Sequence, residues 1–139
     1  MSRYVLDSFA ILAWYSREEG AVQVQQLMQD PRHQRWMTIV NLGEVYYRVA
    51  REIGMSAAFE ALDMVERLPI EFIDADRTLT LTAAGIKARF ALAYADCFAA
   101  AAARQHSAAV VTGDPEFEQL EADGIVAVEW LPHRSRRRR

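Results

Sequence analysis

The alternation that decides the fold begins at residues 3–17, RYVLDSFAILAWYSR. An apolar, β-prone run at 3–6 ends at Asp7, and residues 8–17 then follow a helical pattern. Asp7 or Ser8 could cap this helix. A short strand that passes directly into a helix predicts an α/β protein if the pattern continues along the chain.

The rest of the chain continues this alternation. Further strands are expected at 36–40, 70–73, 108–111 and 125–131, and helices at 21–29, 41–53, 57–68, 76–88, 95–105 and 114–121, with Asn41 and Ser56 as candidate helix caps. Because the strands are nearly all apolar and alternate with helices, we predict a parallel sheet covered on both faces, a three-layer α/β sandwich. Residues 1–132 are expected to form one domain, followed by a basic tail at 133–139.

Composition excludes several classes of protein. Hydrophobic residues make up 52% and charged residues 25%, which is the balance of a globular domain rather than of a disordered chain. The longest apolar stretches are shorter than the ~20 residues that a membrane span requires, and no signal peptide is recognised. Cys97 is the only cysteine, so an intrachain disulfide is impossible. We therefore expect a cytoplasmic protein without membrane association.

The net charge of -3 hides an asymmetry between the body and the tail. Five of the sixteen basic residues fall at 134–139, which leaves 11 basic against 19 acidic residues in the body, a net charge of -8. Such a tail could hold nucleic acid by counterion release, or it could be a solvated end without a role. If the substrate of the acidic body is a nucleic acid, something other than basic patches must neutralise the phosphate.

Four carboxylates fall near the expected carboxyl ends of strands, where open α/β sheets bind ligands. Asp7 follows the first strand, Glu44 lies in the first turn of the helix after the second, Asp96 lies near the start of the helix before the fourth, and Asp114 follows the fourth. Each could alternatively be a helix cap or a charge favoured by the helix dipole. Their joint occurrence at one edge favours a functional site.

Carboxylates crowded without a nearby lysine or arginine repel one another, and a hard divalent cation resolves this repulsion. Oxygen ligands suit Mg²⁺, and such an ion can activate a water for attack on a phosphodiester. The histidines His33, His106 and His133 are scattered and lack metal-ligand spacing. We therefore predict Asp7, Glu44, Asp96 and Asp114 as both the catalytic residues and the metal ligands.

Smaller polar residues flank these carboxylates. Asn41 lies three residues before Glu44 on one helix face, and Ser8 and Thr112 place hydroxyls beside the acidic positions. They could contact the substrate or support the ligands, although capping is the alternative for each. Gly113 would permit close approach of the backbone.

At these residues the chain resembles a PIN domain, and within that family a VapC-type toxin. The matching pieces are Val5-Leu6-Asp7-Ser8, Asn41-Leu42-Gly43-Glu44-Val45, Tyr94-Ala95-Asp96-Cys97-Phe98-Ala99-Ala100 and Val111-Thr112-Gly113-Asp114-Pro115-Glu116-Phe117, and the resemblance spans about residues 4–131. It implies a five-stranded parallel sheet, an acidic Mg²⁺ or Mn²⁺ site at the four carboxylates, and endonucleolytic cleavage of RNA by an activated water. It also implies a homodimer and a cognate antitoxin protein. The arginine tail lies outside the family's pattern.

Other classes fit less well. A response-regulator receiver needs a lysine after the last strand, but Lys87 is the only lysine and lies in the middle of an expected helix. A haloacid-dehalogenase-type phosphatase needs a second aspartate two residues after the first, where this chain has Phe9. The remaining alternative is a catalytically inactive PIN-fold module that binds RNA or protein.

Overall fold

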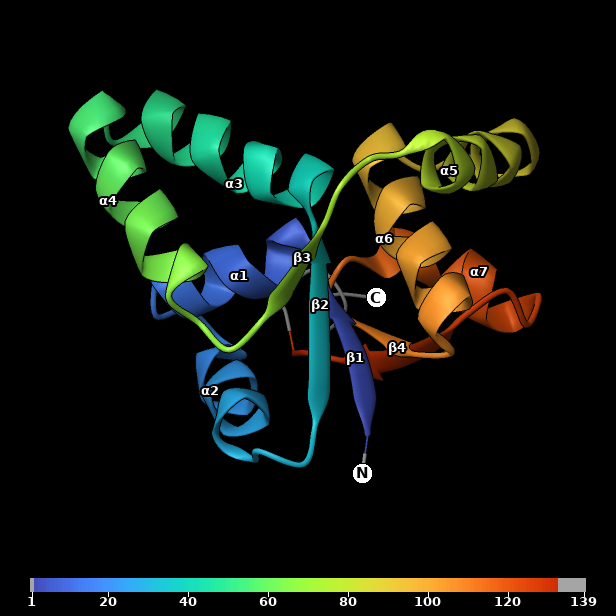
Figure 1. The fold of residues 1–139 in the computed structure, drawn as a ribbon, viewed down its shortest axis with the longest axis horizontal. Helices are drawn as coiled ribbons and strands as arrows, with labels where there is room; N and C mark the ends of the chain where they lie inside the picture. Colours follow the sequence, from blue (N-terminus) through green and yellow to red (C-terminus); the bar gives the residue numbers. More distant parts are fainter. Residues whose placement is uncertain (1, 133–139) are drawn as a thin grey trace.

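The computed structural model describes residues 2–132, so the predicted basic tail lies outside the described residues. Its five strands form one sheet in the order β3-β2-β1-β4-β5, and every neighbouring pair is parallel (Figure 1). The strands are β1 (Arg3–Leu6), β2 (Gln34–Thr38), β3 (Glu71–Ile73), β4 (Ala109–Thr112) and β5 (Ala127–Trp130). This confirms the predicted α/β fold with a five-stranded parallel sheet.

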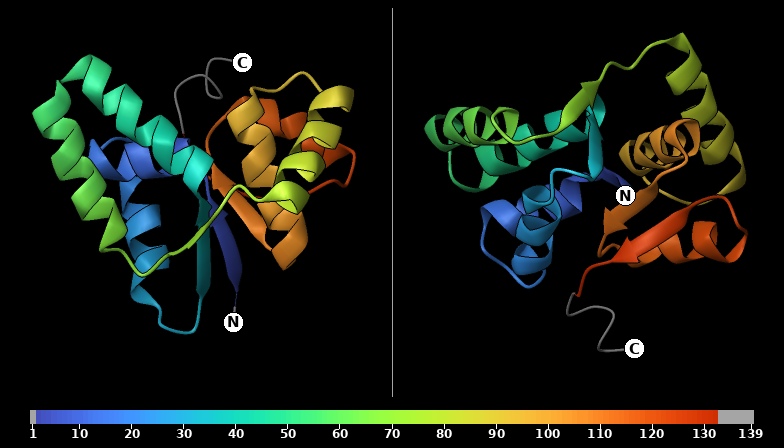
Figure 2. Two further views of the ribbon diagram at one scale, coloured as in Figure 1. Left: turned by 45° about the horizontal axis from the view of Figure 1, so that its top comes forward. Right: turned by 60° about the horizontal axis from the view of Figure 1, so that its bottom comes forward.

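Helices cover both faces of the sheet, as Figure 2 shows from two further directions. On one face lie α1 (Ser8–Tyr15), α2 (Ala21–Gln29), α3 (Ile39–Glu52) and α4 (Met55–Glu66); on the other lie α5 (Arg77–Arg89), α6 (Tyr94–His106), the 3-10 turn η1 (Pro115–Phe117) and α7 (Glu118–Ala122). Because successive strand residues point to opposite faces, Val5 and Val110 join the core under α5–α7, whereas Leu6 and Val111 join the core under α1–α4. The molecule therefore has three layers.

The alanine-rich helix α6 packs closely on the sheet. Residues 99–103 are all alanine and at most 1% exposed, and the helix contacts β1, β2 and β4. Small side chains allow this short distance between helix and sheet. The close packing fixes the start of α6, which carries Asp96, relative to the strand ends.

Two helix caps differ from the sequence prediction. The second strand ends at Thr38, and Thr38 rather than Asn41 caps α3, because its Oγ1 accepts a hydrogen bond of 3.1 Å from the Asn41 backbone N–H. Helix α4 begins at Met55 after Gly54, whose φ of 122° a glycine tolerates, so Ser56 is not its cap. In both helices the spacing of the apolar residues predicts the helix but does not show which residue caps it.

The strand order changes direction at β1. The chain moves from β1 outward through β2 to β3, then returns to place β4 on the other side of β1. Helices leaving β1 and β4 therefore diverge to opposite faces, and the carboxyl ends of these two strands form the switch point where ligands bind in such sheets. No helix among residues 2–132 is long and apolar enough to cross a membrane.

Candidate functional site

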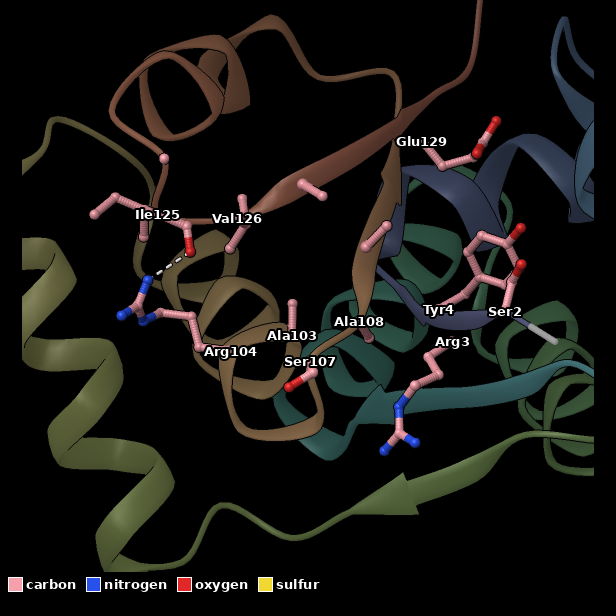
Figure 3. Close-up of a pocket in the computed structure, with 13 residues that line it drawn as sticks. Ser2, Arg3, Tyr4, Ala103, Arg104, Ser107, Ala108, Ile125, Val126 and Glu129 are labelled. Carbon is pink, nitrogen blue, oxygen red and sulfur yellow. Dashed lines mark hydrogen bonds between the residues drawn. The ribbon is translucent and has the colours of Figure 1, made fainter.

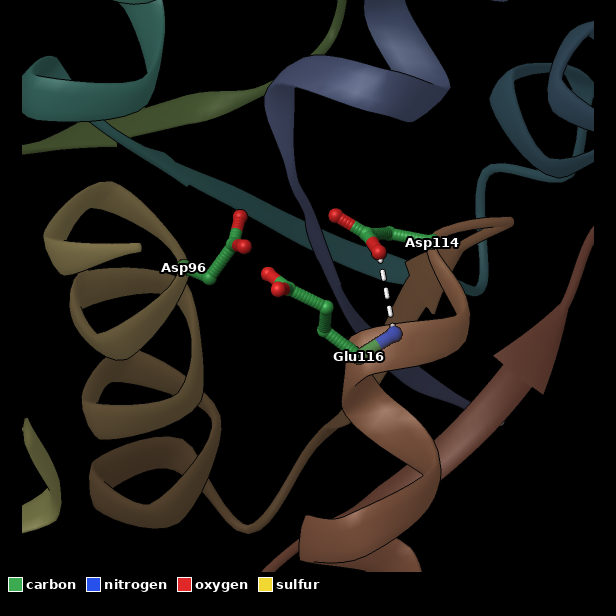
Figure 4. Close-up of side chains that lie close together, drawn as sticks. All are labelled: Asp96, Asp114 and Glu116. Carbon is green, nitrogen blue, oxygen red and sulfur yellow. Dashed lines mark hydrogen bonds between the residues drawn. The ribbon is translucent and has the colours of Figure 1, made fainter. Parts of the chain in front are cut away.

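Three carboxylates meet just beyond the switch point. Asp96 lies in the first turn of α6, Asp114 is the N-cap of η1, and Glu116 is two residues further along the same turn. Each offers one oxygen, and these oxygens all lie within 4.8 Å of one another; Figure 4 shows the three side chains facing the same space. We call Asp96, Asp114 and Glu116 the acidic triad. Glu116 is not among the site residues predicted from the sequence, although its spacing of two from Asp114, a candidate helix cap, is a signal that could have identified it.

Asp7 lies at the end of β1 and is 1% exposed. Its Oδ1 accepts a 2.9 Å hydrogen bond from the Ala10 backbone N–H and so caps α1, whereas its buried Oδ2 has no hydrogen-bond partner among the described residues. The capping interpretation is correct, but it accounts for only one of the two oxygens. A buried carboxylate oxygen without a donor is costly, which is a reason to expect a cation or a proton there.

Glu44 lies on α3, outside the acidic triad. The Ser8 hydroxyl donates a 2.8 Å hydrogen bond to its Oε1, and Nη1 of Arg48 lies 3.7 Å from its Oε2. The sequence analysis did not select Arg48, although the i,i+4 spacing from Glu44 is typical of a helical ion pair. Glu44 is nevertheless close enough for its charge to raise the pKa values of Asp7 and Asp96.

The electrostatics of the site favour protonation in the absence of a cation. Burial, and then the charges of Asp7, Asp114, Glu44 and Glu116, raise the pKa of Asp96 from 3.8 to about 8. Burial also raises the pKa of Asp7 to about 7, with smaller contributions from Asp114 and Glu44, although the Thr112 hydroxyl and the Ala10 N–H oppose this shift.

The other predicted polar residues hold the site's elements together. Nδ2 of Asn41 donates a 3.1 Å hydrogen bond to the Ala95 carbonyl and so joins α3 to the start of α6, while its Oδ1 accepts a 2.5 Å hydrogen bond from the Thr38 hydroxyl. Thr112 Oγ1 accepts a 3.0 Å hydrogen bond from the Asp114 backbone N–H. Asn41 and Thr112 are fully buried, so these contacts assign them a positioning role in the fold.

A cavity of about 740 Å³ lies at the opposite edge of the sheet, by the starts of β1, β4 and β5 (Figure 3). Arg3 and Arg104 line it, but each guanidinium already donates to a backbone carbonyl, that of His106 at 2.7 Å and that of Ile125 at 2.6 Å. Its lining includes a single carboxylate, Glu129. The cavity therefore lacks the ligand set found at the switch point.

The residues at the switch point fit a hard divalent cation. The donors of the acidic triad are carboxylate oxygens, the ligand type that Mg²⁺ and Mn²⁺ prefer. Asp7 lies outside the triad, but its buried Oδ2 has no hydrogen-bond partner among the described residues. Cys97, next to Asp96, is fully buried, and burial raises the pKa of its thiol to about 11, so it packs in the core and does not add a soft ligand. The acidic triad could hold a divalent ion.

Comparisons with known proteins agree with this fold. The family model of the PIN domain matches residues 4–123. Among solved structures, the chain is similar to one in the VapBC2 complex of Rickettsia felis bound to promoter DNA, with a TM-score of 0.73 and 16% identity over 94% of this chain and 99% of the other. It is also similar to Mycobacterium tuberculosis VapC20, described as a toxin that cleaves the sarcin–ricin loop, with a TM-score of 0.72 and 20% identity over 94% and 100% of the two chains. For a chain of DNA-bound VapBC from Salmonella typhimurium the TM-score is 0.69 and the sequence identity 19%, over 93% of this chain and 98% of the other. No curated protein matches significantly.

Proposed function

The chain belongs to the PIN-domain family, and from this premise we propose that it is a metal-dependent endoribonuclease that acts as the toxin of a type II toxin–antitoxin pair. The observation that carries the proposal is the acidic triad beside the unpartnered oxygen of Asp7, at the switch point of the sheet. A family member that had lost its activity would have no physical reason to keep the buried carboxylates of Asp7 and Asp96 close to the carboxylates of Asp114 and Glu116.

Each residue of the candidate site has a part in this proposal. The metal would be held by the acidic triad together with Asp7. Glu44 would be a further ligand and would add a negative charge at the edge of the site. Mg²⁺, or Mn²⁺ in its place, would supply charge neutralisation at the phosphodiester and lower the pKa of the attacking water. Ser8 holds Glu44 in place, Thr112 holds the backbone at Asp114, and Asn41 holds α6 against α3.

The proposed partners follow from the same comparison. The similar structures are named as toxin–antitoxin complexes or as a toxin, and we propose for this chain an RNA substrate, a cognate antitoxin protein, self-association as a homodimer and a cytoplasmic location. Residues 1–132 would form the nuclease domain and residues 133–139 a basic tail that holds RNA by counterion release. An antitoxin that places an arginine or lysine against the acidic triad would replace the charge of the metal.

RNA cleavage by the purified chain tests this proposal. We expect cleavage in Mg²⁺ or Mn²⁺, none in excess EDTA, and recovery when the metal is restored. Asp96→Asn should remain folded and lose cleavage in every metal tested, while the exposed Asp123→Asn serves as the control for loss of one charge. Binding of RNA without cleavage in any divalent metal would instead favour the inactive binding module.

A further inference from the structure

Gly113 is packed against an aromatic ring beside the acidic triad. The residue is buried, and a Cβ built on its backbone would lie 2.4 Å from Cε1 and 2.6 Å from Cζ of Phe9. Real Cβ atoms do not approach other heavy atoms so closely, so the ring occupies the space that any side chain at position 113 would need. Gly113 is not among the glycines with positive φ, and the requirement is therefore for space rather than for a special backbone conformation.

The contact joins two loops that carry proposed metal ligands. Phe9 lies in the first turn of α1, two residues after Asp7, and Gly113 immediately precedes Asp114. These loops leave the neighbouring strands β1 and β4. The Phe9 ring is partly exposed and also packs against the core under α1–α4, so a side chain at position 113 would have to displace the ring from its present place.

From this contact, we propose that Phe9 is a positioning residue whose ring, seated on Gly113, sets the spacing between Asp7 and Asp114. The inference rests on the proposed metal-dependent function and adds a residue to it. A metal site tolerates displacements of its ligands of only about 0.5 Å, so a spacer between two ligand loops acts directly on affinity for the ion. Phe9 itself has no donor atom and does not act as a ligand.

A double-mutant cycle on Mn²⁺ binding to the metal-free chain tests the role without using RNA. The variants are Gly113→Ala, Phe9→Ala and the two combined, with Gly85→Ala as the matched control because a Cβ at Gly85, in α5, meets nothing within 4 Å. We expect each single variant to bind Mn²⁺ about 10-fold more weakly than the parent, the effect typical of changing a residue that orients a metal ligand. The double variant should bind no more weakly than the worse single variant, because one contact can be lost only once.

Urea unfolding of each variant checks that it remains folded. If Phe9→Ala unfolds the chain, Gly113→Ala still tests the proposal, because it adds only a single methyl group. Parent-like Mn²⁺ affinity of folded Gly113→Ala would overturn the positioning role, as would fully additive losses in the double variant. An equal loss of affinity in Gly85→Ala would also overturn it, because the effect would then be general to added methyl groups. A parent chain that binds no Mn²⁺ would overturn the proposed function itself, which is a distinguishable result.

Discussion

Asp96→Asn is expected to stabilise the metal-free chain, and increasingly so as the pH rises. The side chain is 7% exposed, and burial followed by the charge of Asp7 raises its pKa from 3.8 to about 8. Between these two values the folded state binds a proton that the unfolded state has released. The stability that comes from the protonated carboxyl is therefore fully present below pH 3.8 and is lost as the pH rises through the folded pKa.

The magnitude follows from the width of this window. For one proton, the free energy of unfolding falls by about 1.4 kcal/mol per pH unit within the window. Between about pH 5 and pH 7 the parent should thus lose about 2.7 kcal/mol from Asp96, a loss that the asparagine variant does not suffer. Urea unfolding in EDTA at several pH values measures the difference between the two proteins, with Asp123→Asn as the control.

A stability difference that stays constant with pH would refute this reasoning. So would an asparagine variant that is less stable than the parent at neutral pH, because Asp96 would then act as a stabilising cap or hydrogen-bond partner.

Three further outcomes are expected. Millimolar Mg²⁺ or Mn²⁺ should raise the melting temperature of the parent by binding the native state, and Asp96→Asn should respond less; equal responses in a thermal scan would contradict the proposed ligand. Asn41→Ala should lower the free energy of unfolding by about 1–3 kcal/mol, because it leaves the Ala95 carbonyl and the Thr38 hydroxyl without their partner. Removal of residues 133–139 should weaken RNA binding and flatten its salt dependence while cleavage of a short oligonucleotide survives; an unchanged salt slope in a binding titration would leave the tail without that role.

The order and type of the elements were predictable because each strand is a short apolar run, whereas each helix is a longer segment whose apolar residues recur at helical spacing. Their ends were less predictable, because helix starts depend on single hydrogen bonds. Thr38 caps α3 through one hydroxyl, and the sequence offered Asn41 as an equally suitable cap. Apolar periodicity does not distinguish the two.

The location of the site was predictable for a topological reason, whereas its membership was not. Asp7 and Asp114 follow strands that any parallel sheet would end at one edge, and the structure brings Asp114 together with Asp96. Glu116 joins them because the capped turn after Asp114 directs it back toward α6; its spacing from Asp114 is visible in the sequence, but this direction is not. Glu44 instead lies at the edge of the site between Ser8 and Arg48, and its role as a metal ligand stays a prediction.

The central claim is that the acidic triad holds the divalent ion on which RNA cleavage depends. Crystals of the chain soaked in Mn²⁺ test it most directly, since anomalous scattering locates the ion without assumption about its ligands. We predict Mn²⁺ density in contact with carboxylate oxygens of Asp96, Asp114 and Glu116, and loss of that density in Asp96→Asn together with loss of cleavage. Density elsewhere in an active protein, with none at these three residues, would contradict it.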